Sequence, residues 1–418
     1  MLDNFQKKLP KESKKIIGNF LSLSTLQAAN YILPLVVLPY MVRTLGAEKF
    51  GLVMFGQALI MLFKMAVDFG FVISGTREIS LAINNYERKV KVFSAIMYIK
   101  LILTILGALI LISIVESYSK FRDDRLVYYF SYGIVIGNAL FPAWFFQGIE
   151  KMKYITIVNV TAKVIFTVCI FIVVKSEADY LYVPIFNSFG FIVSGLIGFL
   201  FSLKFVKLSL PDILLAKKLL VDTFSLFIAK FASNLYTSCN VLILGFFVDN
   251  SIVGVYSSME KLILAIKNMY GPIYQSIFPW LVKQNDKKRI RTIKKMIPII
   301  ALLGVLITLF LVFFGNITLN LIYNNELITS YGLIFKILGF IAIFSGINML
   351  FSNLYFTSIK KYKLRMNAFI ITGIFNLILS FILVPILGIT GTAISVTCSE
   401  MFLMFVCWYY YKDSIKAY

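Results

Sequence analysis

The chain contains twelve apolar runs of about 19–25 residues, and no other feature restricts its fold as strongly. A helix needs about 20 apolar residues to cross the hydrocarbon core of a bilayer. It also satisfies its backbone hydrogen bonds internally, as lipid demands. We therefore predict an all-α polytopic membrane protein with twelve transmembrane helices. The runs lie at 16–40, 50–72, 92–115, 126–148, 154–174, 180–203, 223–247, 252–274, 297–315, 328–352, 364–386 and 389–410.

Composition limits what the protein can do. Charged residues make up 15% of the 418, against about 25% in a soluble domain. The loops between the runs are too short for a sizeable soluble domain. The chain has no His, and its four Cys lie inside apolar runs, so we expect no metal site and no cofactor.

The distribution of Lys and Arg orients the spans. We number each loop by the span that it follows. Of the 41 Lys and Arg residues, 28 lie in the two tails and the even-numbered loops, with Arg365 counted in the tenth loop beside it. The odd-numbered loops hold six. Short loops rich in Lys and Arg stay in the cytoplasm. We therefore expect cytoplasmic tails at 1–15 and 411–418. This topology also accounts for the net charge of +21 without nucleic acid as a partner.

Internal similarity divides the chain into two halves. The stretch from Gly51 to Lys64 aligns with Gly254 to Lys267 at a spacing of 203, and 149–153 aligns with 359–363 at a spacing of 210. We expect two six-helix lobes, 16–207 and 223–410, joined by an interfacial helix at 208–222. Six spans in each half insert the same way round, giving a pseudo-two-fold axis along the membrane normal. Chance similarity between apolar helices is the alternative.

Seven lysines remain inside the predicted spans. A charge at the bilayer centre costs about 2.5–3.5 kcal/mol on insertion scales, so they should point into the bundle or a watery cavity. Snorkelling to the headgroups is the alternative for three of them, Lys100, Lys230 and Lys336. The other four are Lys64, Lys163, Lys261 and Lys267.

Polar residues share a helical face in each half. Gln57, Lys64 and Asp68 are spaced by seven and four, and Glu260 and Lys267 repeat the spacing of seven. Such lysine-centred stripes would suit an anion. We expect a cationic cavity that binds substrate through Lys64, Lys267, Lys163, Lys100, Lys230 and Lys336. A structural ion pair between Lys64 and Asp68 competes with this interpretation and can coexist with it.

The acids at membrane depth are Asp68, Glu260 and Glu400. A coupling H⁺ or Na⁺ would bind one of them, unless each only neutralises a lysine.

Prolines kink helices, and Pro34 and Pro39 in the first span are the expected hinge, although packing kinks are the alternative.

Three stretches resemble a known family. They are 39–51 (PYMVRTLGAEKFG), 68–80 (DFGFVISGTREIS) and 142–154 (PAWFFQGIEKMKY), with Arg43, Arg77, Glu78, Trp144 and Gln147 as motif positions. Together they are similar to the Wzx-type flippases of O-antigen and capsule oligosaccharides, in the multidrug/oligosaccharidyl-lipid/polysaccharide exporter (MOP) superfamily. The resemblance implies a MATE-like arrangement of two lobes around a central cationic cavity.

The resemblance also implies a function and a location. It implies transport of undecaprenyl-pyrophosphate-linked oligosaccharide from the cytoplasmic to the outer leaflet of the bacterial inner membrane. A polysaccharide polymerase and a chain-length regulator would be partners. The alternatives are a multidrug exporter, a membrane polymerase or glycosyltransferase, and an ion channel. The short outer loops argue against an enzyme, and the lysine excess argues against cationic drugs.

Overall fold

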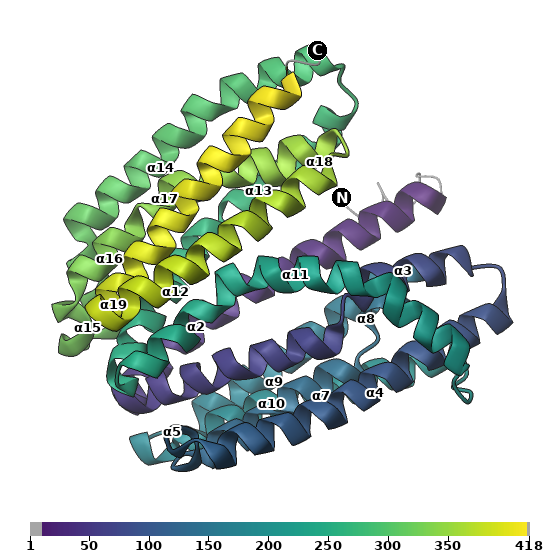
Figure 1. Cartoon of the computed structure of the whole chain (residues 1–418), viewed down its shortest axis with the longest axis horizontal. Helices are drawn as coiled ribbons and strands as arrows, with labels where there is room; N and C mark the ends of the chain where they lie inside the picture. The colour runs from purple at the N-terminus through teal and green to yellow at the C-terminus, as the bar shows by residue number, and fades with distance from the viewer. Residues whose placement is uncertain (1–10, 416–418) are drawn as a thin grey trace, which may run out of the picture. The chain divides into compact units, whose positions relative to one another are not determined.

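A computed structural model describes residues 11–415, except for the side chains of residues 11–32, 229, 232–238 and 279. The predicted N-terminal tail therefore lies largely outside the described residues. The described chain is helical, with no strand among these residues. Its elements are α2 (Lys11–Asp68), α3 (Phe71–Leu81), α4 (Tyr86–Ser117), α5 (Ser119–Arg122), α6 (Arg125–Ser131), α7 (Gly133–Leu140), α8 (Ala143–Gly148), α9 (Met152–Val173), the short η1 (Glu177–Leu181), α10 (Tyr182–Leu203), α11 (Ile213–Phe247), α12 (Asn250–Asn268), α13 (Tyr270–Val282), α14 (Asp286–Tyr323), α15 (Glu326–Ser330), α16 (Gly332–Gly339), α17 (Ile341–Met349), the π-helical turn η2 (Leu350–Tyr355), α18 (Phe356–Ser358) and α19 (Tyr362–Ile415) (Figure 1).

Eight helical segments in the described part of the chain are long and apolar enough to cross a membrane. This confirms the all-helical membrane protein, and the count of twelve spans stays a prediction. Asparagines between the apolar runs cap the N-termini of the helices that follow them. The side chain of Asn85 accepts from Arg88 N at 2.9 Å, and that of Asn285 accepts from Lys288 N at 2.9 Å.

Two glycines interrupt the longest helices. Gly46 has φ 69° and ψ 171° within α2, and Gly388 has φ 54° and ψ −126° within α19. Both conformations lie in the region that favours glycine, so each segment consists of two helices. The backbone remains helical through Pro34 and Pro39, and the break in α2 follows them by several residues.

The chain forms two compact units. Unit 1 comprises the residues up to Val37 together with Leu59–Ile228, and unit 2 comprises Leu38–Ala58 together with Ala229 onwards. Unit 2 thus includes the end of the first predicted span and the start of the second. The predicted interfacial helix is continuous with the seventh span, because α11 runs unbroken from Ile213.

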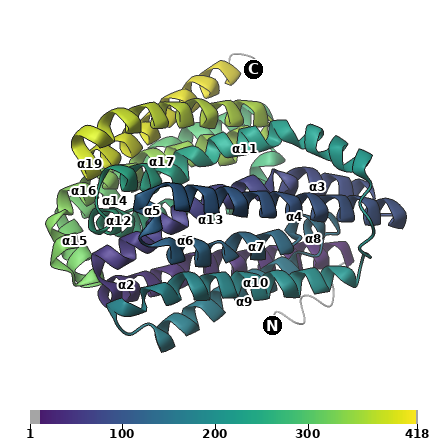
Figure 2. The ribbon, with the colours of Figure 1, turned by 60° about the horizontal axis from the view of Figure 1, so that its bottom comes forward.

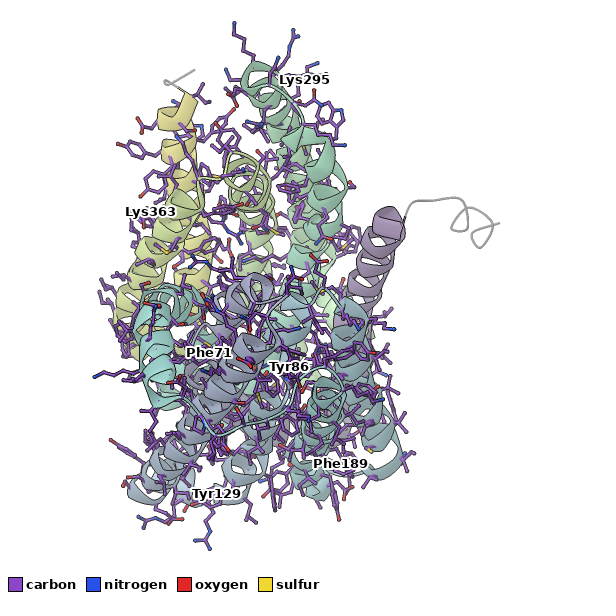
Figure 3. All side chains as sticks on the ribbon, turned by 90° about the vertical axis from the view of Figure 1, so that its right-hand side faces the viewer. Phe71, Tyr86, Tyr129, Phe189, Lys295 and Lys363 are labelled. Carbon is purple, nitrogen blue, oxygen red and sulfur yellow. The ribbon has the colours of Figure 1, made fainter. Side chains whose placement is uncertain are left out.

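Each unit has its own core. In unit 1, α10 packs against both α7 and α9 (Figures 1 and 2). A cluster of buried rings around Trp144 and Phe93 includes Phe145 and Phe146. In unit 2, α17 packs against α14 and α19 (Figure 1). The core of this unit centres on the rings of Tyr270, Phe351, Tyr355 and Tyr411. Lys295 and Lys363 belong to α14 and α19 of this unit (Figure 3).

The two segments related by the spacing of 210 also have the same backbone conformation. Glu150 and Lys360, at equivalent positions, have φ values of 57° and 58°. Lys151 N donates to Phe146 O at 2.8 Å, and Lys361 N donates to Phe356 O at 2.9 Å. The two halves therefore build the same left-handed turn with the same hydrogen bond.

The repeat with a spacing of 203 brings its two glycines together. A methyl group on Gly51 would lie 1.8 Å from Asn250 O, and one on Gly254 would lie 2.0 Å from Ala47 O. Ala47 and Asn250 are themselves 203 residues apart, so the contact is reciprocal. Within unit 2, α2 and α12 therefore cross with backbone against backbone, which only glycine permits at these two positions.

Candidate functional site

In unit 1, a buried ion pair joins two of the predicted site residues. Lys100 Nζ lies 3.3 Å from Asp68 Oδ1 and donates to Asn138 O at 3.0 Å. Asn138 Nδ2 donates to the same Asp68 oxygen at 2.9 Å. Lys100 is 2% exposed, so it does not reach toward headgroups as the snorkelling alternative supposed. The three groups form one neutral cluster from α2, α4 and α7.

Unit 2 contains a similar cluster. Lys267 Nζ forms an ion pair with Glu400 Oε1. Asn348 Nδ2 donates to Glu400 Oε2 at 2.7 Å and to Glu400 O at 3.0 Å. The groups come from α12, α19 and α17. Two of the acids considered for ion coupling, Asp68 and Glu400, thus each neutralise a lysine.

The two asparagines are equivalent in the repeat. Asn138 and Asn348 are 210 residues apart, the spacing of the shared left-handed turn. Sequence reasoning missed both, although that spacing could have identified them. In each half the asparagine precedes the left-handed turn by twelve residues. Its amide donates to the carboxylate that forms an ion pair with a lysine.

A cavity of about 40 Å³ lies beside the cluster of unit 2. Glu260 and Lys267 both line it, as their shared helical face predicted. Asn240, Tyr256 and Glu400 add further polar groups, and the remaining lining is aliphatic. Among residues 11–415, no group of three or more Cys, Asp or Glu side chains is placed to hold a metal ion.

A pair of cations lies in unit 1, on α2 and α9. Lys64 and Lys163 are close enough for their charges to interact, and both are half-buried. Lys64 Nζ also lies 5.3 Å from the centroid of the Phe191 ring. Two like charges held together in an apolar protein form a site that an anion would stabilise. The other predicted cations, Lys230 on α11, Lys261 on α12 and Lys336 on α16, are half-buried.

Arg43, from the first motif stretch, caps a helix within unit 2. Its guanidinium donates to the carbonyl oxygens of Leu321, Ile322 and Tyr323 at 2.9, 2.6 and 3.2 Å. These are the last carbonyls of α14, where a cation is favoured by the helix dipole. Arg43 therefore fixes the end of the first span to α14.

The other two motif stretches pack on one another in unit 1, through α3 and α8. Thr76 Oγ1 lies 3.1 Å from Trp144 O and 3.2 Å from Gln147 Oε1. Trp144 is buried, Arg77 is exposed, and Glu78 forms an ion pair with Arg88 at 3.0 Å. Trp144 and Gln147 thus join α8 to α3, whereas Glu78 joins α3 to α4.

Comparisons with known proteins agree with this architecture. A model of the family described as polysaccharide biosynthesis protein matches residues 16–285. A relative from Escherichia coli (strain K12), whose name describes an O-antigen transporter, is 28% identical over 93% of this chain and 96% of its own. One of the same description from Shigella dysenteriae is 30% identical over 92% of this chain and 97% of its own.

Solved structures show a similar fold. An inward-facing multidrug resistance MATE family transporter of the MOP superfamily has a TM-score of 0.65 at 16% identity, over 96% of this chain and 98% of its own. The lipid II flippase MurJ in an inward closed conformation has a TM-score of 0.61 at 17% identity, over 95% of this chain and 87% of its own.

Proposed function

Because the chain belongs to the polysaccharide biosynthesis protein family, we propose that it is a flippase for lipid-linked oligosaccharides. Its substrate would be the undecaprenyl-pyrophosphate-linked repeat unit of an O-antigen or capsule, moved from the cytoplasmic to the outer leaflet of the inner membrane. Relatives described as O-antigen transporters, aligned over nearly the whole chain, support this assignment. The twelve-span topology with both termini in the cytoplasm is part of the proposal.

The observation that carries the proposal is the cation pair of Lys64 and Lys163 at membrane depth. A pyrophosphate carries negative charge that two neighbouring lysines would attract, and each charged hydrogen bond to it would contribute ~1.5–3 kcal/mol. The predicted role of Lys100 weakens, because its charge is neutralised by Asp68. Lys267, also paired, has a side chain that is 20% exposed and lies at the edge of its cluster.

Movement would use the helices that pass between the units. The chain passes from unit 1 to unit 2 between Val37 and Leu38, and this point lies between Pro34 and Pro39. A proline removes a backbone hydrogen bond and lowers the cost of bending a helix there. These prolines thus remain the proposed hinge for alternating access.

Substitution of the cation pair tests the proposal. In a flippase-deleted strain, Lys64→Glu and Lys163→Glu should abolish surface glycan, because each reverses the charge that meets the pyrophosphate. Lys64→Arg should retain part of the export, and the exposed Lys175→Glu serves as a matched control. The measurement is surface glycan at matched expression. Normal export by both Glu variants would contradict the cationic path.

A second test addresses orientation and the competing exporter function. A reporter active only in the periplasm should be active after Asn250 or Asn325 and silent after Lys288 or Lys361. The reverse pattern would overturn the orientation. Drug resistance restored without surface glycan would favour the multidrug exporter.

A further inference from the structure

The three acids at membrane depth have different surroundings. Asp68 and Glu400 each accept from a lysine and from an asparagine amide. Glu260 forms no ion pair with any residue between 11 and 415 that the structure describes. Glu260 is therefore the acid at this depth whose charge is left without such a partner.

The cavity of about 40 Å³ brings other groups to Glu260. Tyr256 and Lys267 face it from the same helix, Asn240 from α11 and Glu400 from α19. The lining from α16 and α17 is aliphatic, and α13 and α15, which also pack on α12, contribute no described residue to it. Lys261 follows Glu260 on α12 and its charge acts on that carboxylate, although it does not line the cavity. Within the lining, Lys267 and Glu400 cancel, so the ionisation of Glu260 sets the net charge.

The buried hydroxyl of Tyr256 supports a role for this cavity in binding. It is fully buried and lies close enough to the Glu260 carboxylate to interact with its charge. A buried hydroxyl without a hydrogen bond is costly, and the Glu260 carboxylate is an acceptor within reach. Tyr256 lies one helical turn before Glu260, at a spacing that lets the two side chains meet.

A proton fits this site better than a metal cation. The oxygens of Glu400 already accept from Lys267 and Asn348, which leaves few oxygens to surround a metal ion. A proton requires a single carboxylate oxygen, and a cavity of this size holds about one water to carry it.

We propose that Glu260 binds the proton that couples this transporter to the transmembrane proton gradient, while Asp68 and Glu400 remain in their ion pairs. This proposal rests on the proposed transport function. When the proton leaves Glu260, two carboxylates in one cavity compete for the Lys267 ammonium. Lys267 then shifts from Glu400 toward Glu260, which weakens the link between α12 and α19. Proton release is thereby converted into a change in how two helices of unit 2 are joined.

The test follows carboxyl protonation directly in the full-length purified protein. Infrared absorption of the protonated carboxyl group is recorded during a pH titration in proteoliposomes. We expect Glu260→Gln to lose one titrating carboxyl per chain. Glu400→Gln and the double variant Asp68→Asn/Lys100→Met, which removes both charges of the unit 1 pair, should keep that signal. Glu260→Asp should restore a titrating group, which guards against a folding defect.

Three outcomes would overturn the proposal. They are an unchanged titration in Glu260→Gln, loss of the signal in Glu400→Gln instead, and a sodium-dependent shift that Glu260→Gln abolishes. Glycan export in a flippase-deleted strain is measured separately, with and without a protonophore. If the wild-type protein exports no glycan while the titration behaves as expected, the proposed function fails and the proton site stands.

Discussion

The ion pairs of the two units are buried in opposite senses. In unit 1 the Lys100 side chain is 3% exposed and that of Asp68 is 18% exposed, whereas in unit 2 Lys267 is 20% exposed and Glu400 is 3% exposed. Unit 1 thus buries the cation and leaves the carboxylate nearer the edge. Unit 2 does the reverse. The equivalent asparagine accompanies an ion pair in both units, whether the lysine or the carboxylate is the more buried member. The repeat therefore preserves a neutral buried ion pair but not which of its two charges is buried more deeply.

The largest expected effect comes from removing the less buried member of each pair. Lys267→Met would leave the buried Glu400 uncompensated, and Asp68→Asn would do the same to Lys100. Each should lower the free energy of unfolding by about 3–5 kcal/mol. Removing the deeply buried member instead, as in Lys100→Met or Glu400→Gln, should cost less, because the remaining charge can reach water.

Thermal unfolding in detergent, followed by tryptophan fluorescence, measures these differences. The double variant Asp68→Asn/Lys100→Met should recover most of the loss of Asp68→Asn. Equal losses for both members of a pair would show that the difference in burial has no energetic consequence.

A smaller and symmetric effect is expected where the two halves share backbone geometry. Gly51→Ala and Gly254→Ala each push a methyl group into a carbonyl oxygen of the opposing helix. Each should cost about 1–3 kcal/mol, and the two losses should be nearly equal because the contact is reciprocal. Gly271→Ala is the control, since its new methyl group would meet nothing closer than 4.0 Å. Clearly unequal losses in the same unfolding assay would refute the reciprocity.

The smallest effect is expected at the shared left-handed turns. Glu150 and Lys360 hold positive φ values that side chains disfavour. Glu150→Gly and Lys360→Gly should therefore raise the free energy of unfolding, each by at most about 1 kcal/mol. Denaturant titration against wild type measures both. A loss of stability at one turn alone would show that its side chain has a role that the other lacks.

The sequence predicted the helices well, because the length of an apolar run and its bordering polar residues are local properties. It also placed Glu260 and Lys267 on one face, since a spacing of seven fixes that face within a single helix. It did not predict that Lys100 pairs with Asp68, 32 positions away, because that pairing depends on how α2, α4 and α7 pack. The break in α2 at Gly46 falls within 41–49, between the first two predicted spans, and its positive φ suits a glycine. The hinge predicted at Pro34 and Pro39 concerns a motion and stays a prediction.

The three passages between the units all lie inside continuous helices, at Val37/Leu38, Ala58/Leu59 and Ile228/Ala229. Helical connections transmit register as well as position. Inserting one residue at a passage would rotate the rest of that helix by about 100° and advance it by about 1.5 Å. A surface loop absorbs an added residue, whereas here the residue would have to be accommodated as a bulge within the helix itself.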